Sequence, residues 1–517
     1  MRSTMLQLET PCNPEDQASR VDGLSLEPQL TAGVRIVKNR PLHMAQSRSS
    51  TDDEHEQTHF YTLYHALHSH KRPTRDRHRA YDFIQEQIKA AQALPCELPD
   101  HPEDLGPWIN RHVSLILQRH CEYYHRRQQG GAREYFPSKA HALLFMQRVA
   151  PRKLVDCSWL YGTLQHWDDI RLRPLIHRYL EFLGQGNAAD NRVYIYQKML
   201  EQEGIHASLV QPDGDYEQAC IQLALGVSGS RLLPEIIGFH LGYECLMLEV
   251  LNCRDELFEL VDVRDFTPYN NKSGSDLTQI RTALQVISAM LPPDEESRQA
   301  FYSRLKDGYR LSQIGATAMD IVSELQRPGS LEQAVMEVMV NHFGHGRLGH
   351  DDFTPENGTQ DDEDLSGYAE VKRFLTVLKA KGWIRLGTDP KENRFWQMIH
   401  IEHGVMSSVF SPAEQQIVYD WIARTGQPEA DDINAVIHGP LRKLSQQHLP
   451  RKTPKHLQRE VPTELCQQLE RGEPSQRFEL LIPYLRSGLH ETPVGVWAAR
   501  QYQIQLAAHT PLANAHD

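Results

Sequence analysis

The sequence lacks the features that mark several common classes of protein. Its eight cysteines form no CxxC pair, so we expect a reduced, cytoplasmic protein in which they serve as small core residues. Acidic residues outnumber basic ones and give a net charge of −13, which argues against a nucleic-acid partner. No apolar run approaches the roughly 20 residues that cross a bilayer, and the N-terminus has no apolar secretory core. We therefore expect no membrane association and no export by the secretory route.

Two catalytic motifs are also missing. The chain contains no phosphate-binding glycine loop of the GxxxxGK(S/T) type. The small residues at 226–230 do not follow a strand, which a nucleophile elbow requires, so we interpret them as a structural loop.

Apolar residues recur with helical spacing, and almost no segment alternates as a strand would. The clearest stripe follows the pattern i, i+3, i+4, i+7, i+8 and i+11 and predicts a buried helix face. Its members are Leu172, Leu175, Ile176, Tyr179, Leu180 and Leu183. The sequence therefore predicts an all-α protein. Polar composition predicts disorder for residues 1–55, and the acidic stretch at 351–364 predicts an exposed loop.

One apolar helix carries three ionisable side chains. Pro234 suits the first turn of a helix, so we expect the helix to begin there. Glu235, His240 and Glu244 follow within it, and the last two lie four residues apart on one face. This spacing allows either a metal-binding pair or an internal His–Glu hydrogen bond. Glu235 points about half a turn away from Glu244, so a cavity shared by both requires helices packed on two sides.

Seven short segments in order between Pro151 and Ile422 carry a family resemblance. They read APRKLVD with WLYG, RPLI, IQLAL, EIIGFHLGYE, DGYRL, RFW and VFSPAEQ. On these segments the chain resembles the iron-containing redox enzyme family of the haem-oxygenase-like superfamily, in its long form. The resemblance implies a haem-oxygenase-like helical bundle at 56–350 and a smaller C-terminal helical region at 351–425. Residues 426–517 are then expected to form a helical appendage.

The resemblance also implies a chemistry. Family members hold non-haem iron, usually a di-iron centre that activates O2, with carboxylates and histidines from several helices. The implied substrate is a small amine, an amino acid or a fatty-acid-like molecule. Haem is not expected, because a shared fold does not transfer a cofactor. Self-association into a homo-oligomer stays open.

The chain departs from the family at positions where metal ligands are expected. Where relatives have a second acid after Glu181 and a histidine after Asn191, this chain has Phe182 and Arg192. The third metal-binding helix of the family offers His, Asp and His. This chain has Tyr269, Ser273 and Gln279 there, within a stretch at 267–276 that predicts a turn.

The iron centre is therefore either lost or rebuilt from other residues. His342 lies in a histidine-rich stretch at 341–352, which also fits a solvated loop. The candidate metal ligands are Glu181, Glu235, His240, Glu244 and His342.

Three functions remain open at this point. The first is an iron- and O2-dependent oxidoreductase, as the family implies. The second is a metal-free descendant that acts as a binding or scaffold subunit. The third is a cofactor-independent hydrolase or lyase that uses Glu235, His240 and Glu244 for acid–base work.

Overall fold

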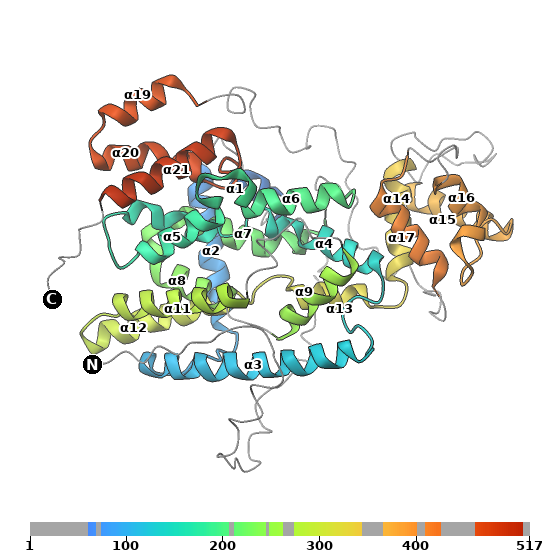
Figure 1. The fold of residues 1–517 in the computed structure, drawn as a ribbon, viewed down its shortest axis with the longest axis horizontal. Helices are drawn as coiled ribbons and strands as arrows, with labels where there is room; N and C mark the ends of the chain where they lie inside the picture. Colours follow the sequence, from blue (N-terminus) through green and yellow to red (C-terminus); the bar gives the residue numbers. More distant parts are fainter. Residues whose placement is uncertain are drawn as a thin grey trace, which may run out of the picture. The chain divides into compact units, whose positions relative to one another are not determined.

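The protein is helical throughout the part that the structure describes. The computed structural model describes residues 60–68, 74–205, 211–244, 248–261, 273–343, 366–400, 409–424 and 461–509. These residues contain no strand, which confirms the all-α prediction (Figure 1). Residues 1–55, for which disorder is predicted, lie outside the described residues.

The helices have the following bounds. They are α1 (Phe60–His68), α2 (Thr74–Gln92), α3 (Leu105–Gln128), α4 (Lys139–Lys153), α5 (Arg173–Phe182), α6 (Arg192–Gln202), α7 (Glu217–Ser228), α8 (Leu233–Glu244), α9 (Leu248–Leu260), α11 (Ser273–Met290), α12 (Glu295–Leu311), α13 (Ala318–Leu325), α14 (Ser330–Phe343), α15 (Ser366–Ala380), α16 (Arg394–His400), α17 (Pro412–Ala423), α19 (Thr463–Arg471), α20 (Pro474–Leu481) and α21 (Pro493–Ala508). Short 3-10 turns connect several of them, notably η2 (Ser158–His166), η3 (Gly184–Gly186), η6 (Gly229–Leu232) and η11 (Ile482–Leu485).

Local sequence signals account for several of these boundaries. The apolar stripe at 172–183 lies on and beside α5, and all six of its members are at most 1% exposed. Helix α8 begins at Leu233 with Pro234 in its first turn, as predicted. Ser411 is the N-cap residue of α17 and forms a capping box with Glu414. The side chain of each residue accepts a hydrogen bond from the backbone N–H of the other.

One local prediction is wrong in part. The stretch at 267–276 was expected to be a turn, but α11 starts at Ser273 and continues through Asp276. Serine and aspartate favour the first turn of a helix as well as turns, because their side chains bond to nearby backbone N–H groups. Residues 267–272 lie outside the described part of the chain.

Two clusters of buried apolar residues hold the helices together. The first includes side chains of α1, α2, α3, η2, α5, α7, α8, α11 and α12. The second includes side chains of α4, α6, α13, α14, α15, α16 and α17. Residues 59–517 form one compact unit, and the boundaries expected near 350 and 425 lie outside the described residues and stay predictions.

The segment at 461–509, part of the appendage expected at 426–517, is helical and contributes side chains to the first cluster. The Tyr179 hydroxyl donates to the Leu485 carbonyl at 2.5 Å, and the Tyr502 hydroxyl donates to the Leu164 carbonyl at 2.7 Å. Phe478 is fully buried and stacks on Trp167 with ring centres 4.4 Å apart. The C-terminal helices α20 and α21 therefore complete the core around α5 and η2.

Helices α8 and α12 approach each other at the level of the backbone. A Cβ atom at Gly238 would lie 1.9 Å from the Leu305 carbonyl oxygen, and one at Gly308 would lie 2.0 Å from the Glu235 carbonyl oxygen. Such distances exclude any side chain larger than hydrogen unless the helices move apart. The crossing fixes the axial position of α8, which carries His240.

The segment Asp213–Tyr243 is, by length and composition alone, long and apolar enough to cross a membrane. Its most apolar window is 72% buried inside the structure, as the core helix of a globular domain also is. The segment comprises α7 and α8 with their connecting turn, and both helices contribute to the first core cluster.

Candidate functional site around His240

His240 is a fully buried polar side chain without a hydrogen bond. It lies on α8 with 0% exposure, and neither ring nitrogen has a partner within the described residues. The internal His–Glu hydrogen bond considered from the spacing would involve Glu244, whose side chain lies outside the described residues, so that bond stays a prediction. A buried polar group without a partner is rare in native proteins and points to a functional role.

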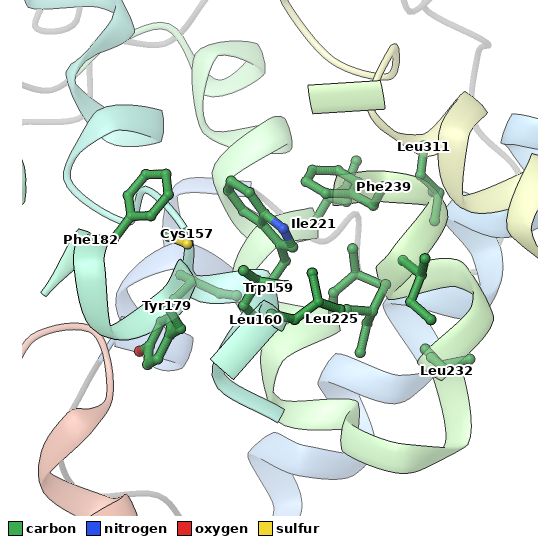
Figure 2. Packing of buried hydrophobic residues seen from close by; sticks show 14 of the residues in the cluster. Cys157, Trp159, Leu160, Tyr179, Phe182, Ile221, Leu225, Leu232, Phe239 and Leu311 are labelled. Carbon is green, nitrogen blue, oxygen red and sulfur yellow. The ribbon is translucent and has the colours of Figure 1, made fainter. Parts of the chain in front are cut away.

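The ring of Trp159 lies beside this imidazole and joins it to a cluster of aromatic side chains. The ring centre of Trp159, on η2, lies 6.2 Å from that of His240, 5.2 Å from that of Phe239 and 4.5 Å from that of Tyr243. The indole Nε1 of Trp159 is buried and likewise has no partner among the described residues. Figure 2 shows Trp159 in the core of this cluster, with Phe182 and Phe239 near it. The site thus combines an apolar wall with polar atoms whose hydrogen-bonding capacity is unused.

Tyr243 is anchored at the rim of this cluster. Its hydroxyl donates to the Asp156 carboxylate at 2.9 Å, and Asp156 is 6% exposed. Lys153 lies 3.8 Å from the same carboxylate. These contacts fix one wall of the aromatic cluster from the residues just before η2.

Two guanidinium groups stand on the other side of Trp159. The guanidinium carbons of Arg178 and Arg192 lie 4.4 Å and 4.0 Å from the ring centre of Phe182. The Phe182 ring in turn meets Trp159 edge-on, with ring centres 6.4 Å apart. Arg178 is 6% exposed and pairs with Glu181 at 3.0 Å. Arg178 of α5 and Arg192, the first residue of α6, therefore place positive charge next to the His240 cluster.

Burial and, to a smaller extent, the positive charge of Arg178 together lower the pKa of His240 to about 3. The imidazole is therefore neutral at physiological pH. A neutral imidazole offers one donor and one acceptor nitrogen, which suits a polar ligand or a metal.

This shift predicts a loss of stability in acid. The unfolded chain takes up a proton at His240 below about pH 6.5, whereas the folded chain does not until about pH 3. Stability therefore falls as the pH decreases through this window. Relative to His240→Asn, the wild type should lose about 2 kcal/mol between about pH 7.5 and about pH 5. Urea unfolding of both proteins at the two pH values measures the difference. A difference that does not change with pH would mean that His240 is not held neutral.

The structure does not bring Glu235 to His240. Both carboxylate oxygens of Glu235 accept hydrogen bonds from Arg304 of α12, each at 2.7 Å. Glu235 is 4% exposed, so this bidentate pair neutralises a buried charge. It acts together with the glycine crossing to hold α8 against α12, while His240 points toward η2.

The other candidate ligands are also dispersed. The side chain of Glu181 is 49% exposed. His342 lies on α14, where its Nε2 is 3.2 Å from a carboxylate oxygen of Glu414. Its ring contacts Phe410 of the second core cluster, whereas the neighbours of His240 on α8 belong to the first. Glu244 closes α8, but its side chain lies outside the described residues.

The departures from the family pattern are only partly visible. Phe182 and Arg192 contact each other next to the His240 cluster. Ser273 and Gln279 lie on α11, which packs against α8, but their side chains are not described. Tyr269 lies outside the described residues.

The described side chains do not fit an iron centre. They contain no group of three or more His, Cys, Asp and Glu residues that could hold a metal ion. Both carboxylate oxygens of Glu235 accept from Arg304, and the position after Glu181 holds an aromatic ring that two guanidinium groups contact. Among the expected ligands whose side chains the structure describes, His240 is the one that is buried in this cluster with both ring nitrogens unpaired.

Sequence reasoning missed Arg178 and Arg304. Arg178 lies between members of the apolar stripe on the buried side of α5. A charged residue at such a position indicates a functional or paired charge, so the sequence did contain a signal for Arg178. Arg304 lies 69 residues beyond Glu235, and no local pattern links the two. Comparison of the chain with models of protein families, with curated proteins and with solved structures found no match.

Proposed function

We propose that this chain has the haem-oxygenase-like bundle of the iron-containing redox enzymes without their iron centre, and that it serves as a small-molecule-binding subunit. The seven matching segments support the relationship. The unused hydrogen-bonding atoms of His240 and Trp159, inside an aromatic cluster, support a binding role.

One observation carries the proposal. Where the resemblance implies an acid and a histidine, Arg178 and Arg192 both lie over the ring of Phe182. Two fixed guanidinium charges beside the cluster disfavour a bound dication and favour an anion. Glu235, the nearest buried carboxylate on α8, is already neutralised by Arg304.

The acid–base alternative has less support. General acid–base catalysis needs a proton-transferring pair within hydrogen-bond reach. His240 makes no hydrogen bond among the described residues, and Glu235 is occupied by a guanidinium.

Iron content tests the proposal. Full-length protein grown with added iron should purify with far less than one iron atom per chain and should not consume O2 with a reductant. His240→Ala should leave the iron content unchanged, because no iron is held there. Elemental analysis and oxygen electrode measurements provide the readouts.

The same experiment can establish the iron enzyme instead. Stoichiometric iron in the wild type that falls in His240→Ala would show a rebuilt site, because loss of a ligand removes metal-binding energy. The variant His342→Ala is the matched control, since its imidazole pairs with Glu414 in the other core cluster.

A further inference from the structure

We infer that the junction between α5 and α6 binds a small oxyanion, a carboxylate or a phosphate, through Arg178, Arg192 and Asn191. The inference rests on the proposed function, because it names the ligand class of the binding subunit. The resemblance places metal ligands at this junction, and it assigns no anion site there.

The positive charge at this junction is concentrated. The guanidinium carbons of Arg178 and Arg192 both lie within 4.4 Å of the centre of one phenyl ring. Arg178 has a carboxylate partner, Glu181, whose side chain is 49% exposed and therefore screened by solvent. The positive charge of Arg178 also acts on the core, because it disfavours protonation of His240. A planar guanidinium fork is the protein group best matched to carboxylate and phosphate oxygens.

The start of α6 adds donors to the same place. Asn191 is the N-cap residue, and its side-chain oxygen accepts from the Tyr194 backbone N–H at 3.1 Å. The other atom of this amide, Nδ2, is a donor without a partner among the described residues, although Asn191 is 0% exposed. Arg192 is the first residue of the 11-residue helix. The N-terminal end of a helix carries partial positive charge, which stabilises a bound anion.

The loop before α6 is held in place on two sides. Gly184 and Gly186 both have positive φ, at 74° and 86°. A Cβ at Gly184 would lie 2.6 Å from the Asn191 backbone nitrogen, and one at Gly186 would lie 2.6 Å from the Cβ of Arg500 on α21. The loop therefore fits between the start of α6 and the C-terminal helix without room for side chains. Such packing positions Asn191 and Arg192 before any ligand arrives, which lowers the cost of binding.

Anion titrations test the inference. Sodium phosphate and sodium acetate are added to the full-length protein, with sodium chloride at matched ionic strength as reference, and the melting temperature and the heat of binding are measured. We expect phosphate or acetate to raise the melting temperature and to give a saturable heat of binding, and we expect neither effect from chloride. The stronger of the two shows whether the site takes a phosphate or a carboxylate.

Three variants assign the response to this junction. Arg178→Gln and Arg192→Gln should each weaken binding about tenfold or more, through loss of a charge-assisted contact. Asn191→Asp keeps the helix cap, because aspartate also accepts from the Tyr194 N–H, but it places a negative charge at the site and should abolish binding. Arg171→Gln is the control with the same loss of charge, since Arg171 is 51% exposed and pairs with Asp169 before α5.

Three results would overturn the inference. One is the absence of a saturable response to either anion in iron-free protein. The second is an equal loss of response in Arg171→Gln, and the third is full retention of the response in Asn191→Asp. Iron analysis of the same preparation separates the two ideas: stoichiometric iron contradicts the proposed function, whereas a flat anion titration contradicts this inference alone.

Discussion

Gly238→Ala should destabilise the protein by about 4 kcal/mol or more, the largest effect that we expect from a single added methyl group. The new Cβ would lie 1.9 Å from the Leu305 carbonyl oxygen, and a backbone atom cannot rotate away as a flexible side chain can. Helices α8 and α12 must therefore separate, which loosens the packing of both helices in the first core cluster. Gly308→Ala, on the facing helix, should behave in the same way.

A helical glycine in open space provides the control. Gly106 lies in the first turn of α3, and a Cβ there would meet no atom within 4 Å. Gly106→Ala should change the stability by no more than about 1 kcal/mol, because alanine favours the helix whereas Pro107, the next residue, disfavours a helical conformation at a residue that carries a Cβ. Unfolding of the three variants in guanidinium chloride measures the differences. Equal stability of Gly238→Ala and Gly106→Ala would show that α8 and α12 do not meet at the backbone.

Glu256→Ala should cost on the order of 4 kcal/mol, because it leaves several buried donors without an acceptor. Glu256 lies on α9 with 0% exposure. Its carboxylate accepts from the backbone N–H of Tyr135 at 2.8 Å and of Phe136 at 2.9 Å. The Glu134 N–H and the Tyr123 hydroxyl donate to the other oxygen. One carboxylate thus holds the chain between α3 and α4 against α9.

An exposed acid on the same helix separates this effect from a general loss of negative charge. Glu259 pairs with Arg127 and Arg133, and its side chain is 42% exposed. Glu259→Ala should cost less than about 1 kcal/mol, as surface ion pairs usually do. Urea unfolding of the two variants gives the comparison. Equal losses of the free energy of unfolding in the two variants would show that the buried Glu256 carboxylate contributes no more to stability than an exposed one.

The sequence predicted those features that depend on neighbouring residues. The apolar stripe of α5 and the start of α8 at Pro234 both follow from spacing and local backbone chemistry, and both are confirmed. The turn expected at 267–276 was wrong in part, because the same small polar residues also begin helices.

Features that depend on distant residues could not be predicted in this way. The partner of Glu235 is Arg304, on a helix packed through glycines, and spacing alone gave no reason to choose it. His240 was expected to have a hydrogen-bonded or metal-bound role, yet its neighbours come from η2 and α5 rather than from its own helix. The segment at 461–509 looked separate because its amphipathic stretches are short and rich in proline. Its partners lie on α1, η2 and α5, some 300 residues or more earlier in the chain.

The large sequence separation between the C-terminal helices and their partners limits when the core can be completed during synthesis. Arg486 donates to the Leu67 carbonyl at 2.6 Å, and the two residues are 419 positions apart. At the usual rate of translation, a ribosome needs between about 20 and 80 s to make the intervening chain. Until the C-terminal helices are made, the surfaces of η2 and α5 that they cover lie open to solvent, to a chaperone or to another nascent chain.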